Sequence, residues 1–277
     1  MALDQVDVDK LNDSGKEMSF LDHLEALRWH LFRSAIAITI GAGLVFAYLD
    51  EIFKNVILAP KDPNFITFRL LCKLGPTFCY QPPKFDLVTR ELGEQFTESM
   101  YVGVWLGVII ASPYILYEIW KFIRPGLYKK EQDAVSGIVV ICALLFLVGV
   151  CFGYFVMAPF SIAFLSTYTV GAINSPTLSS YISYMTMFTL PIGLVFELPV
   201  ILFFMTKIGF ITPSFLKTYR RHAMVVIVIT AGVITPPDVL SQMLVCFPLL
   251  LLYEVSIFVC KREYKRKKRK EAELENL

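Results

Sequence analysis

Six runs of apolar residues alternate with polar connections along this chain. They extend from about Leu31 to Leu49, Thr97 to Ile123, Val135 to Pro159, Tyr181 to Thr206, Ala223 to Ile234 and Val239 to Cys260. A helix rises about 1.5 Å per residue, so about 20 apolar residues cross the roughly 30 Å hydrocarbon core of a membrane. The pattern predicts an all-α integral membrane protein with six transmembrane helices, of which the fifth, with twelve residues, and the sixth are short.

The polar connections divide the predicted chain into three parts. Residues 1–18 are polar and are expected to form a flexible cytoplasmic N-terminus. Residues 19–260 form the six-helix membrane domain, and residues 261–277 form a basic, charged cytoplasmic tail. Residues 50–96 form a long first outer loop, which contains five prolines and no run of 20 apolar residues.

An amphipathic segment precedes the first apolar run. Its apolar residues recur at helical spacing: Phe20, Leu24, Leu27 and Leu31. This pattern suits a helix that lies on the membrane surface. It suits equally well the first, solvated turns of the first transmembrane helix.

Composition and charge support a membrane protein and set its orientation. Hydrophobic residues make up 56% of the chain and charged residues 18%, and the mean hydropathy is +0.59. Soluble domains have about 45–50% apolar and about 25% charged residues. Twenty of the 26 Lys and Arg residues lie in the N-terminal region, in the connections after the second and fourth runs, and in the tail. Because basic residues accumulate on the cytoplasmic side, both termini are predicted to be cytoplasmic. The pI of 8.1 comes mainly from the tail, so no nucleic-acid partner is indicated.

The outer loop contains two cysteines, Cys72 and Cys79, with six residues between them. An oxidising outer compartment would allow them to form a disulfide. The other four cysteines fall within the apolar runs or at their ends, where cysteine usually acts as a small apolar residue. No cysteine or histidine group has the spacing of a metal site, so neither a metal nor a cofactor is expected.

Enzyme signatures are missing, but one glutamate lies deep in an apolar run. The chain has no phosphate-binding loop, no Gly-x-Ser-x-Gly and no His-Glu-x-x-His. Glu197 precedes Lys207 by ten residues, about 15 Å of helix. An ionisable residue at the membrane centre costs roughly 2.5–3.5 kcal/mol, so it usually faces a bundle interior or a wet cavity. Pro199 leaves the Val195 carbonyl without its helical donor, which predicts a polar locus, although a protonated glutamate bonded to that carbonyl is the alternative. Glu254 is a weaker candidate.

A second polar group surrounds the connection between the last two runs. It consists of Thr235, Asp238 and Gln242. Asp238 follows two prolines and is expected to cap the N-terminus of the last helix. Gln242 lies one turn further on the same face, where its amide could hydrogen-bond a helix of another protein.

The second apolar run ends in aromatic residues and a basic turn. Four side chains are expected to form a collar at the membrane interface: Tyr114, Tyr117, Trp120 and Phe122. Pro125-Gly126 then ends the helix, and the turn finishes on one carboxylate, Glu131. The alternative is an ordinary basic loop of the kind that every multi-pass membrane protein has.

Four motifs occur in order along residues 18–260. They read Phe20-Leu-Asp-His-Leu-Glu-Ala-Leu-Arg28, Phe122-Ile-Arg-Pro-Gly-Leu-Tyr-Lys-Lys-Glu131, Phe196-Glu197-Leu-Pro199 and Thr235-Pro-Pro-Asp-Val-Leu-Ser-Gln242. Each motif alone is weak, but together they resemble the TatC family, the receptor subunit of the twin-arginine protein translocase. The resemblance implies a bacterial cytoplasmic (inner) membrane protein that binds Arg-Arg signal peptides of folded cargo and is driven by the proton-motive force.

The resemblance also implies which residues bind the signal peptide. Glu131 is expected to contact a signal-peptide guanidinium, with Phe122, Arg124, Glu25 and Arg28 in the same site. A carboxylate can hold the planar guanidinium fork bidentately, whereas a Lys ammonium cannot match that geometry.

A separate set of residues is implied to receive membrane partners. These partners are single-span TatA and TatB proteins, further copies of the complex and the surrounding lipid. The expected polar contacts are Glu197, Thr235, Gln242 and Asp238. Pro60 matches a proline of the family's first outer loop, and Pro199 is expected to have a structural role.

The first motif departs from the family pattern at one position. The family usually has His-Leu-x-Glu-Leu-Arg, whereas this chain has Ala26 at the acidic position. Glu25 is one residue away, about 100° around the helix, so it does not automatically replace the missing acid. We expect Ala26→Glu to tighten the binding of twin-arginine peptides.

A proton-coupled secondary transporter of a small solute, with Glu197 as proton relay, is the alternative function. Such transporters commonly contain repeated halves with broken helices at matching positions. Residues 31–123 and 135–260 show no convincing correspondence of this kind. Copurified single-span partners would favour the receptor, and a bound solute would favour the transporter.

Overall fold

The computed structural model describes residues 20–75, 79, 82, 85–124, 135–171, 175–235 and 238–275. Across these residues the protein is helical, and the β pairing they contain is one isolated bridge between Val88 and Thr177. The predictions for residues 1–18, the Pro125-Gly126 turn and Glu131 lie outside the described residues.

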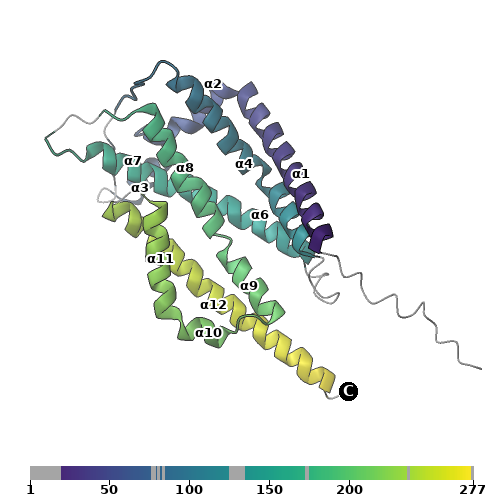
Figure 1. Cartoon of the computed structure of the whole chain (residues 1–277). Coiled ribbons are helices and arrows are strands. Elements are labelled where there is room, and N and C mark those ends of the chain that lie inside the picture. The colour runs from purple at the N-terminus through teal and green to yellow at the C-terminus, as the bar shows by residue number, and fades with distance from the viewer. Residues whose placement is uncertain are drawn as a thin grey trace, which may run out of the picture.

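Helices α1 (Phe20–Ala47) and α4 (Glu94–Ile123) lie side by side and form the most extensive helix pair of the fold (Figure 1). Glycines allow their backbones to approach closely, because a Cβ atom on Gly41 would lie 2.9 Å from the Gly107 carbonyl oxygen. Helix α1 is continuous from Phe20, so the amphipathic segment forms the first turns of the first transmembrane helix and not a separate surface helix.

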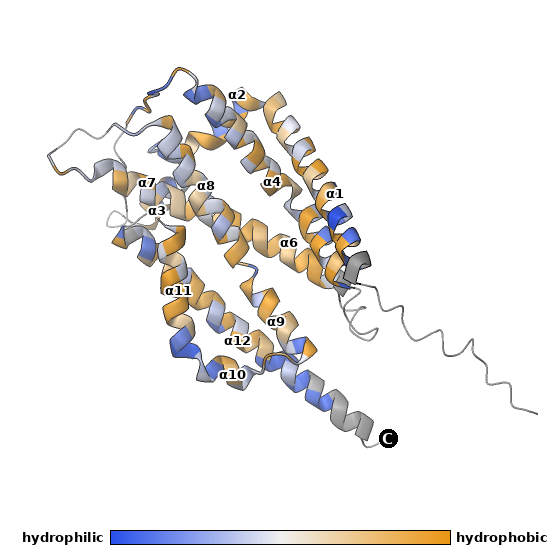
Figure 2. Cartoon of the chain, in the orientation of Figure 1, coloured by the Kyte–Doolittle hydropathy of each residue, from blue (hydrophilic) through white to orange (hydrophobic). Residues whose placement is uncertain are grey.

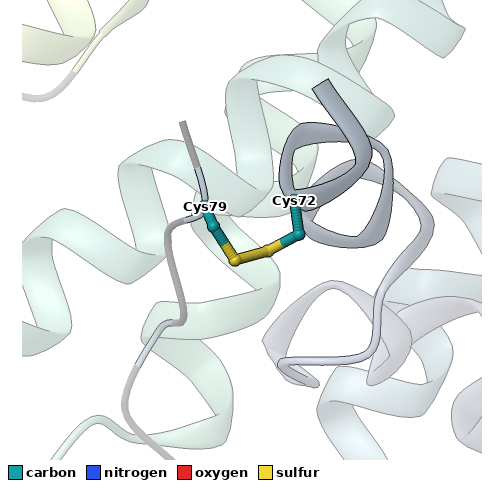
Figure 3. The surroundings of a disulfide bond; sticks show 2 residues. All are labelled: Cys72 and Cys79. Atoms are coloured by element: carbon teal, nitrogen blue, oxygen red, sulfur yellow. A yellow bond between two sulfur atoms is a disulfide. The ribbon is translucent and has the colours of Figure 1, made fainter. Parts of the chain in front are cut away.

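Short helices fold the first outer loop against the bundle. They are α2 (Leu49–Ile52), the π-helix η2 (Phe53–Ile57), the 3₁₀-helix η3 (Ala59–Lys61) and α3 (Ile66–Leu74). Pro60 is buried in η3. The Tyr154 hydroxyl donates a hydrogen bond to the Val56 carbonyl at 2.7 Å and so ties this loop to the third apolar segment. At the end of α3, Cys72 is joined to Cys79 by a disulfide (Figure 3).

The centre of the bundle is built on α8 (Leu178–Val195). Its side chains at helical spacing are almost fully buried: Tyr181, Met185, Phe188 and Ile192. Around it lie α6 (Val135–Phe152), the π-helix η6 (Gly153–Met157) and α7 (Ala158–Thr167). A Cβ atom on Gly153 would lie 2.0 Å from the Phe188 carbonyl oxygen, so η6 packs directly on the α8 backbone.

The fourth apolar run is broken in its middle. Helix α8 ends at Val195 and α9 (Leu198–Ile208) begins with Pro199 in its first turn, which leaves Glu197 between the two helices. The polar locus predicted beside Pro199 is therefore a break in the helix, because proline has no N–H to continue the ladder.

Three helices complete the chain: α10 (Pro213–Thr218), α11 (Arg220–Ile234) and α12 (Val239–Glu275). The prediction of a short sixth helix is wrong, because α12 contains 37 residues and continues without a break through the basic tail. Residues 261–275 contain neither Gly nor Pro and are rich in Lys, Arg and Glu, which are good helix formers. Figure 2 shows the resulting change along α12 from apolar to hydrophilic residues.

Five helical segments of the described chain are long and apolar enough to cross a membrane. They are His23–Ala47, Glu94–Ile123, Gly137–Thr167, Leu178–Ile208 and Ser241–Arg266. Helix α11 has 15 residues, about 22 Å, which is shorter than the hydrocarbon core. The predicted sixth crossing thus depends on this short helix.

Candidate functional site

A buried carboxylate joins the N-terminal half of α1 to the C-terminal end of α4. The Glu118 side chain is 3% exposed, and its Oε2 atom hydrogen-bonds Nδ1 of His30. The Arg33 guanidinium lies 4.0 Å from the same oxygen. Glutamate is almost never fully buried unless it is paired, and here α1 supplies His30 and Arg33 while Tyr114 of α4 hydrogen-bonds the same carboxylate.

The sequence reasoning missed this group. Glu118 is the one acid between Glu98 and Glu131, and His30 and Arg33 lie at the start of the first apolar run. Charges at these positions signal a buried pair, but the identity of the partners depends on how α1 is aligned with α4.

The aromatic residue Phe122 is held against α1 one turn beyond Glu118. The His23 ring stacks on the Phe122 ring with centroids 4.2 Å apart, and the His30 ring meets it edge-on at 5.9 Å. Arg124, directly after α4, is exposed. Two of the predicted signal-peptide residues therefore stand at the end of α4, with the first motif of the chain beside them.

The acidic position of the first motif faces this contact. Ala26 is half-buried, and its spacing from His23 and His30 puts it on the same face of α1. Glu25 and Arg28 are exposed. The structure thus places Phe122 against α1. The Glu25 side chain points to solvent and does not supply the carboxylate that is missing at position 26.

Glu197 lies inside the bundle at the break between α8 and α9. It is 7% exposed, and its carboxyl lies against the Cys142 thiol and the Phe146 backbone of α6. Among the described residues, its Oε1 atom has no hydrogen-bond partner. The indole Nε1 of Trp120 donates to Cys142 Sγ at 3.2 Å, so a polar chain connects α4, α6 and the helix break.

Trp120 is consequently not part of an interface collar. It is 6% exposed and meets Phe204 edge-on at 4.9 Å, whereas Tyr114 and Tyr117 are 41% and 46% exposed. Position 120 faces α6 because it lies two residues from Glu118 and Phe122, which face α1.

The polar group around the α11–α12 connection is bonded mostly within the chain. Asp238 caps α12, since its Oδ1 atom accepts from the Ser241 N–H at 2.7 Å. The Thr235 hydroxyl donates to the Ala231 carbonyl at 2.9 Å. The Gln242 amide donates to the Val228 carbonyl of α11 at 3.4 Å. Asp238 Oδ2 has no hydrogen-bond partner within the described part of the chain.

A cavity of about 1190 Å³ lies beside Asp238 of this group and reaches Phe196 at the helix break. Its lining is mainly apolar and includes Phe152, Phe164, Phe196, Asp238 and Phe247. Phe196 precedes Glu197, so the cavity extends from the turn at Asp238 towards the break. Glu254, the weaker candidate, forms an ion pair with Arg220 between α12 and α11.

Comparisons with known proteins agree with one another. The family model described as "Sec-independent protein translocase protein (TatC)" matches residues 22–248. The Sec-independent protein translocase protein TatC of Blattabacterium sp. subsp. Periplaneta americana (strain BPLAN) is 36% identical over 258 residues, which is 90% of this chain and 97% of the relative. The protein TatCy of Bacillus subtilis (strain 168) is 38% identical over 92% of this chain and 94% of the relative.

Solved structures are similar over the same region. A crystal structure of the twin arginine translocase receptor TatC has a TM-score of 0.69 and 33% identity, and the match covers 87% of this chain and 99% of that chain. A second crystal structure of that receptor, in DDM, has a TM-score of 0.71 and 32% identity over 86% of this chain and 99% of that chain.

Proposed function

This chain belongs to the TatC family of Sec-independent protein translocase proteins, and from that membership we propose that it is a receptor for twin-arginine signal peptides. Family membership makes it a multi-pass protein of the bacterial inner membrane and a subunit of the twin-arginine translocase. Family membership favours a translocase subunit over the proton-coupled secondary transporter, because the family match includes Glu197 and most of the membrane domain.

One observation carries the proposal for signal-peptide recognition. Phe122 of the second motif stacks on His23 of the first, so two motifs from distant parts of the chain form one surface at the end of α4. The chain after Arg124 leads to Glu131, the proposed guanidinium ligand. A hydrogen bond to a charged group contributes about 1.5–3 kcal/mol, so losing one carboxylate weakens binding without unfolding the bundle.

Site-specific crosslinking tests this surface. A photoreactive residue in place of Phe122 should crosslink to an added Arg-Arg signal peptide and much less to the Lys-Lys version. A photoreactive residue in place of Leu92, which is fully exposed and precedes α4 at its far end, is the control. Equal crosslinking from positions 122 and 92 would contradict the proposed signal-peptide surface.

The proposed receptor crosses the membrane six times, with both termini in the cytoplasm. Twenty of 26 Lys and Arg residues then lie on the cytoplasmic side. Helix α11 begins at Arg220 and is about 22 Å long, which is shorter than the hydrocarbon core. Local thinning of the bilayer and flanking side chains that extend to the membrane interface compensate for this difference.

The proposed partner surface lies around the cavity between the helix break and α12. Single-span TatA- and TatB-type helices would dock there, and further copies of the chain would join a larger complex. Glu197 follows Phe196, which lines the cavity. Its buried carboxyl has one oxygen without a hydrogen-bond partner among the described residues, and this oxygen can accept a hydrogen bond from a polar residue of a docked helix. Thr235, Asp238 and Gln242 at the α11–α12 connection would supply further polar contacts.

Copurification tests the partner surface. Glu197→Leu should reduce the recovery of single-span partners severalfold from detergent-solubilised membranes. Glu254→Gln, which removes the acid of α12 that is paired with Arg220 of α11, is the matched control. Unchanged recovery with Glu197→Leu would contradict the assignment.

A further inference from the structure

A groove with basic walls lies between α10 and the second half of α12. Its volume is about 500 Å³, and its lining includes Ser214, Lys217, Lys261, Lys265, Lys268 and Arg269. Among the side chains that the structure describes, none of these five cations has a carboxylate within ion-pair distance. Five like charges in one groove repel one another, so a bound anion would stabilise this arrangement.

The walls of the groove are fixed by contacts between α10 and α12. The Tyr253 hydroxyl donates a hydrogen bond to the Leu216 carbonyl at 2.8 Å. Leu216, Ile257 and Cys260 are buried together in one apolar cluster. The groove is therefore part of the fold, although its lysines are exposed.

An apolar strip continues from the groove along the same face of α12. Leu251, Phe258 and Lys265 follow at intervals of seven residues, and each interval turns the helix by only about 20°. Leu251 and Phe258 are 53% and 69% exposed. This face changes from apolar to basic between Phe258 and Lys265, over about 10 Å of helix.

The change falls at the depth of the lipid headgroups. Residues Val239 to Cys260 extend about 33 Å as a helix, which is close to the roughly 30 Å thickness of the hydrocarbon core. Lys261 is the next residue. Figure 2 shows hydrophilic residues on the stretch of α12 beyond its apolar part, with further hydrophilic residues on α10.

We propose that this groove binds the headgroup of an anionic phospholipid whose acyl chains lie along Leu251 and Phe258. Lysine and arginine donate to phosphate oxygens, and basic pockets at the cytoplasmic ends of membrane helices favour anionic lipids. The proposal goes beyond signal-peptide recognition, and it takes from the proposed function only the cytoplasmic position of the C-terminus.

Lipid titration of the full-length protein by native mass spectrometry tests the proposal. Phosphatidylglycerol should bind more tightly than phosphatidylcholine with the same acyl chains. The triple variant Lys261→Gln/Lys265→Gln/Lys268→Gln should weaken phosphatidylglycerol binding about a hundredfold, about fivefold for each lysine. The control Lys54→Gln/Lys61→Gln/Lys73→Gln removes the same charge at the opposite end of the fold and should bind normally.

Two further measurements are needed. One distinguishes a lipid headgroup from a free phosphate ester, and the other distinguishes the lipid site from the signal-peptide site. Phe258→Ser should weaken lipid binding, whereas water-soluble glycerol phosphate should not compete at equal concentration. The proposal is overturned if phosphatidylcholine binds as well as phosphatidylglycerol, if the triple variant matches its control, or if glycerol phosphate displaces the lipid. Arg-Arg peptide binding is measured on the same variants, so loss of lipid binding with normal peptide binding separates this site from the receptor surface.

Discussion

His30 of α1 hydrogen-bonds the buried carboxylate of Glu118 on α4, and the two residues are 88 positions apart in the chain. This contact pairs polar groups at an otherwise apolar helix interface. Because Arg33 also approaches Glu118, the pair fixes how the first motif of α1 is placed beside the end of α4. The geometry of the proposed receptor surface depends on that placement.

Removing only His30 should destabilise the protein more than replacing both His30 and Glu118 with apolar residues. His30→Leu removes the imidazole partner of the buried Glu118 carboxylate and leaves Arg33 and Tyr114 beside it, so the loss in the free energy of unfolding should fall below the roughly 3–5 kcal/mol that breaking a buried pair costs when no other partner remains. The double variant His30→Leu/Glu118→Leu should be markedly more stable than His30→Leu alone. Thermal unfolding in detergent measures both, and a simple addition of two losses would argue against the pair.

Gly153 should not tolerate even one added methyl group. In Gly153→Ala the Cβ atom would lie 2.0 Å from the Phe188 carbonyl oxygen, so the two backbones must separate. Overpacking of this kind costs about 1–3 kcal/mol. Gly137→Ala on α6 is the control, since its Cβ meets nothing within 4 Å, and it should leave the melting temperature unchanged or raise it. Equal melting temperatures for the two variants would contradict the close packing of η6 on α8.

The disulfide in the outer loop predicts a specific thiol count. Under non-reducing denaturation four cysteines should react with maleimide, namely Cys142, Cys151, Cys246 and Cys260. After reduction six should react. Closing a loop of this size contributes about 2.5 kcal/mol by chain entropy, so Cys72→Ser should also make the loop more sensitive to protease. Six reactive thiols before reduction would refute the bond.

Ala26 stands where the TatC family usually has an acidic residue, and it lies beside the contact between Phe122 and α1. Because Ala26 faces the Phe122 contact, Ala26→Glu should place a second carboxylate at the proposed peptide site. Charged hydrogen bonds contribute about 1.5–3 kcal/mol, so affinity for an Arg-Arg peptide should rise about ten- to a hundredfold. Leu24→Glu is the matched control, since Leu24 is exposed and lies about 200° around α1 from Ala26, so the added carboxylate should change affinity little. Unchanged affinity with Ala26→Glu in a fluorescence titration would refute the expectation.

Much of the fold follows from the pattern of apolar residues. Each apolar run contains a helix, and the polar locus predicted at Glu197 and Pro199 lies at the break between α8 and α9. The extent of α12 did not follow, because hydropathy marks where a helix leaves the membrane and not where the helix ends. Helix propensity of the tail was the signal for its continuation.

Contacts between helices were harder to predict. Asp238 was assigned correctly as a cap because capping is local to the chain. Glu118 was missed and Trp120 was assigned wrongly to the interface collar, since His30 and Cys142, their respective partners, lie on other helices and depend on helix alignment. Sequence spacing gives the face on which a side chain lies, but the neighbouring helix decides whether that face is buried.

The account depends most on the proposed recognition of the Arg-Arg pair at the C-terminal end of α4. Titration of a fluorescent Arg-Arg signal peptide against the purified full-length protein and its Glu131→Gln variant tests this most directly. We expect the variant to bind about ten- to a hundredfold more weakly, while its melting temperature stays unchanged and the Lys-Lys peptide binds both proteins poorly. Equal affinity of the two proteins for the Arg-Arg peptide would contradict the assignment.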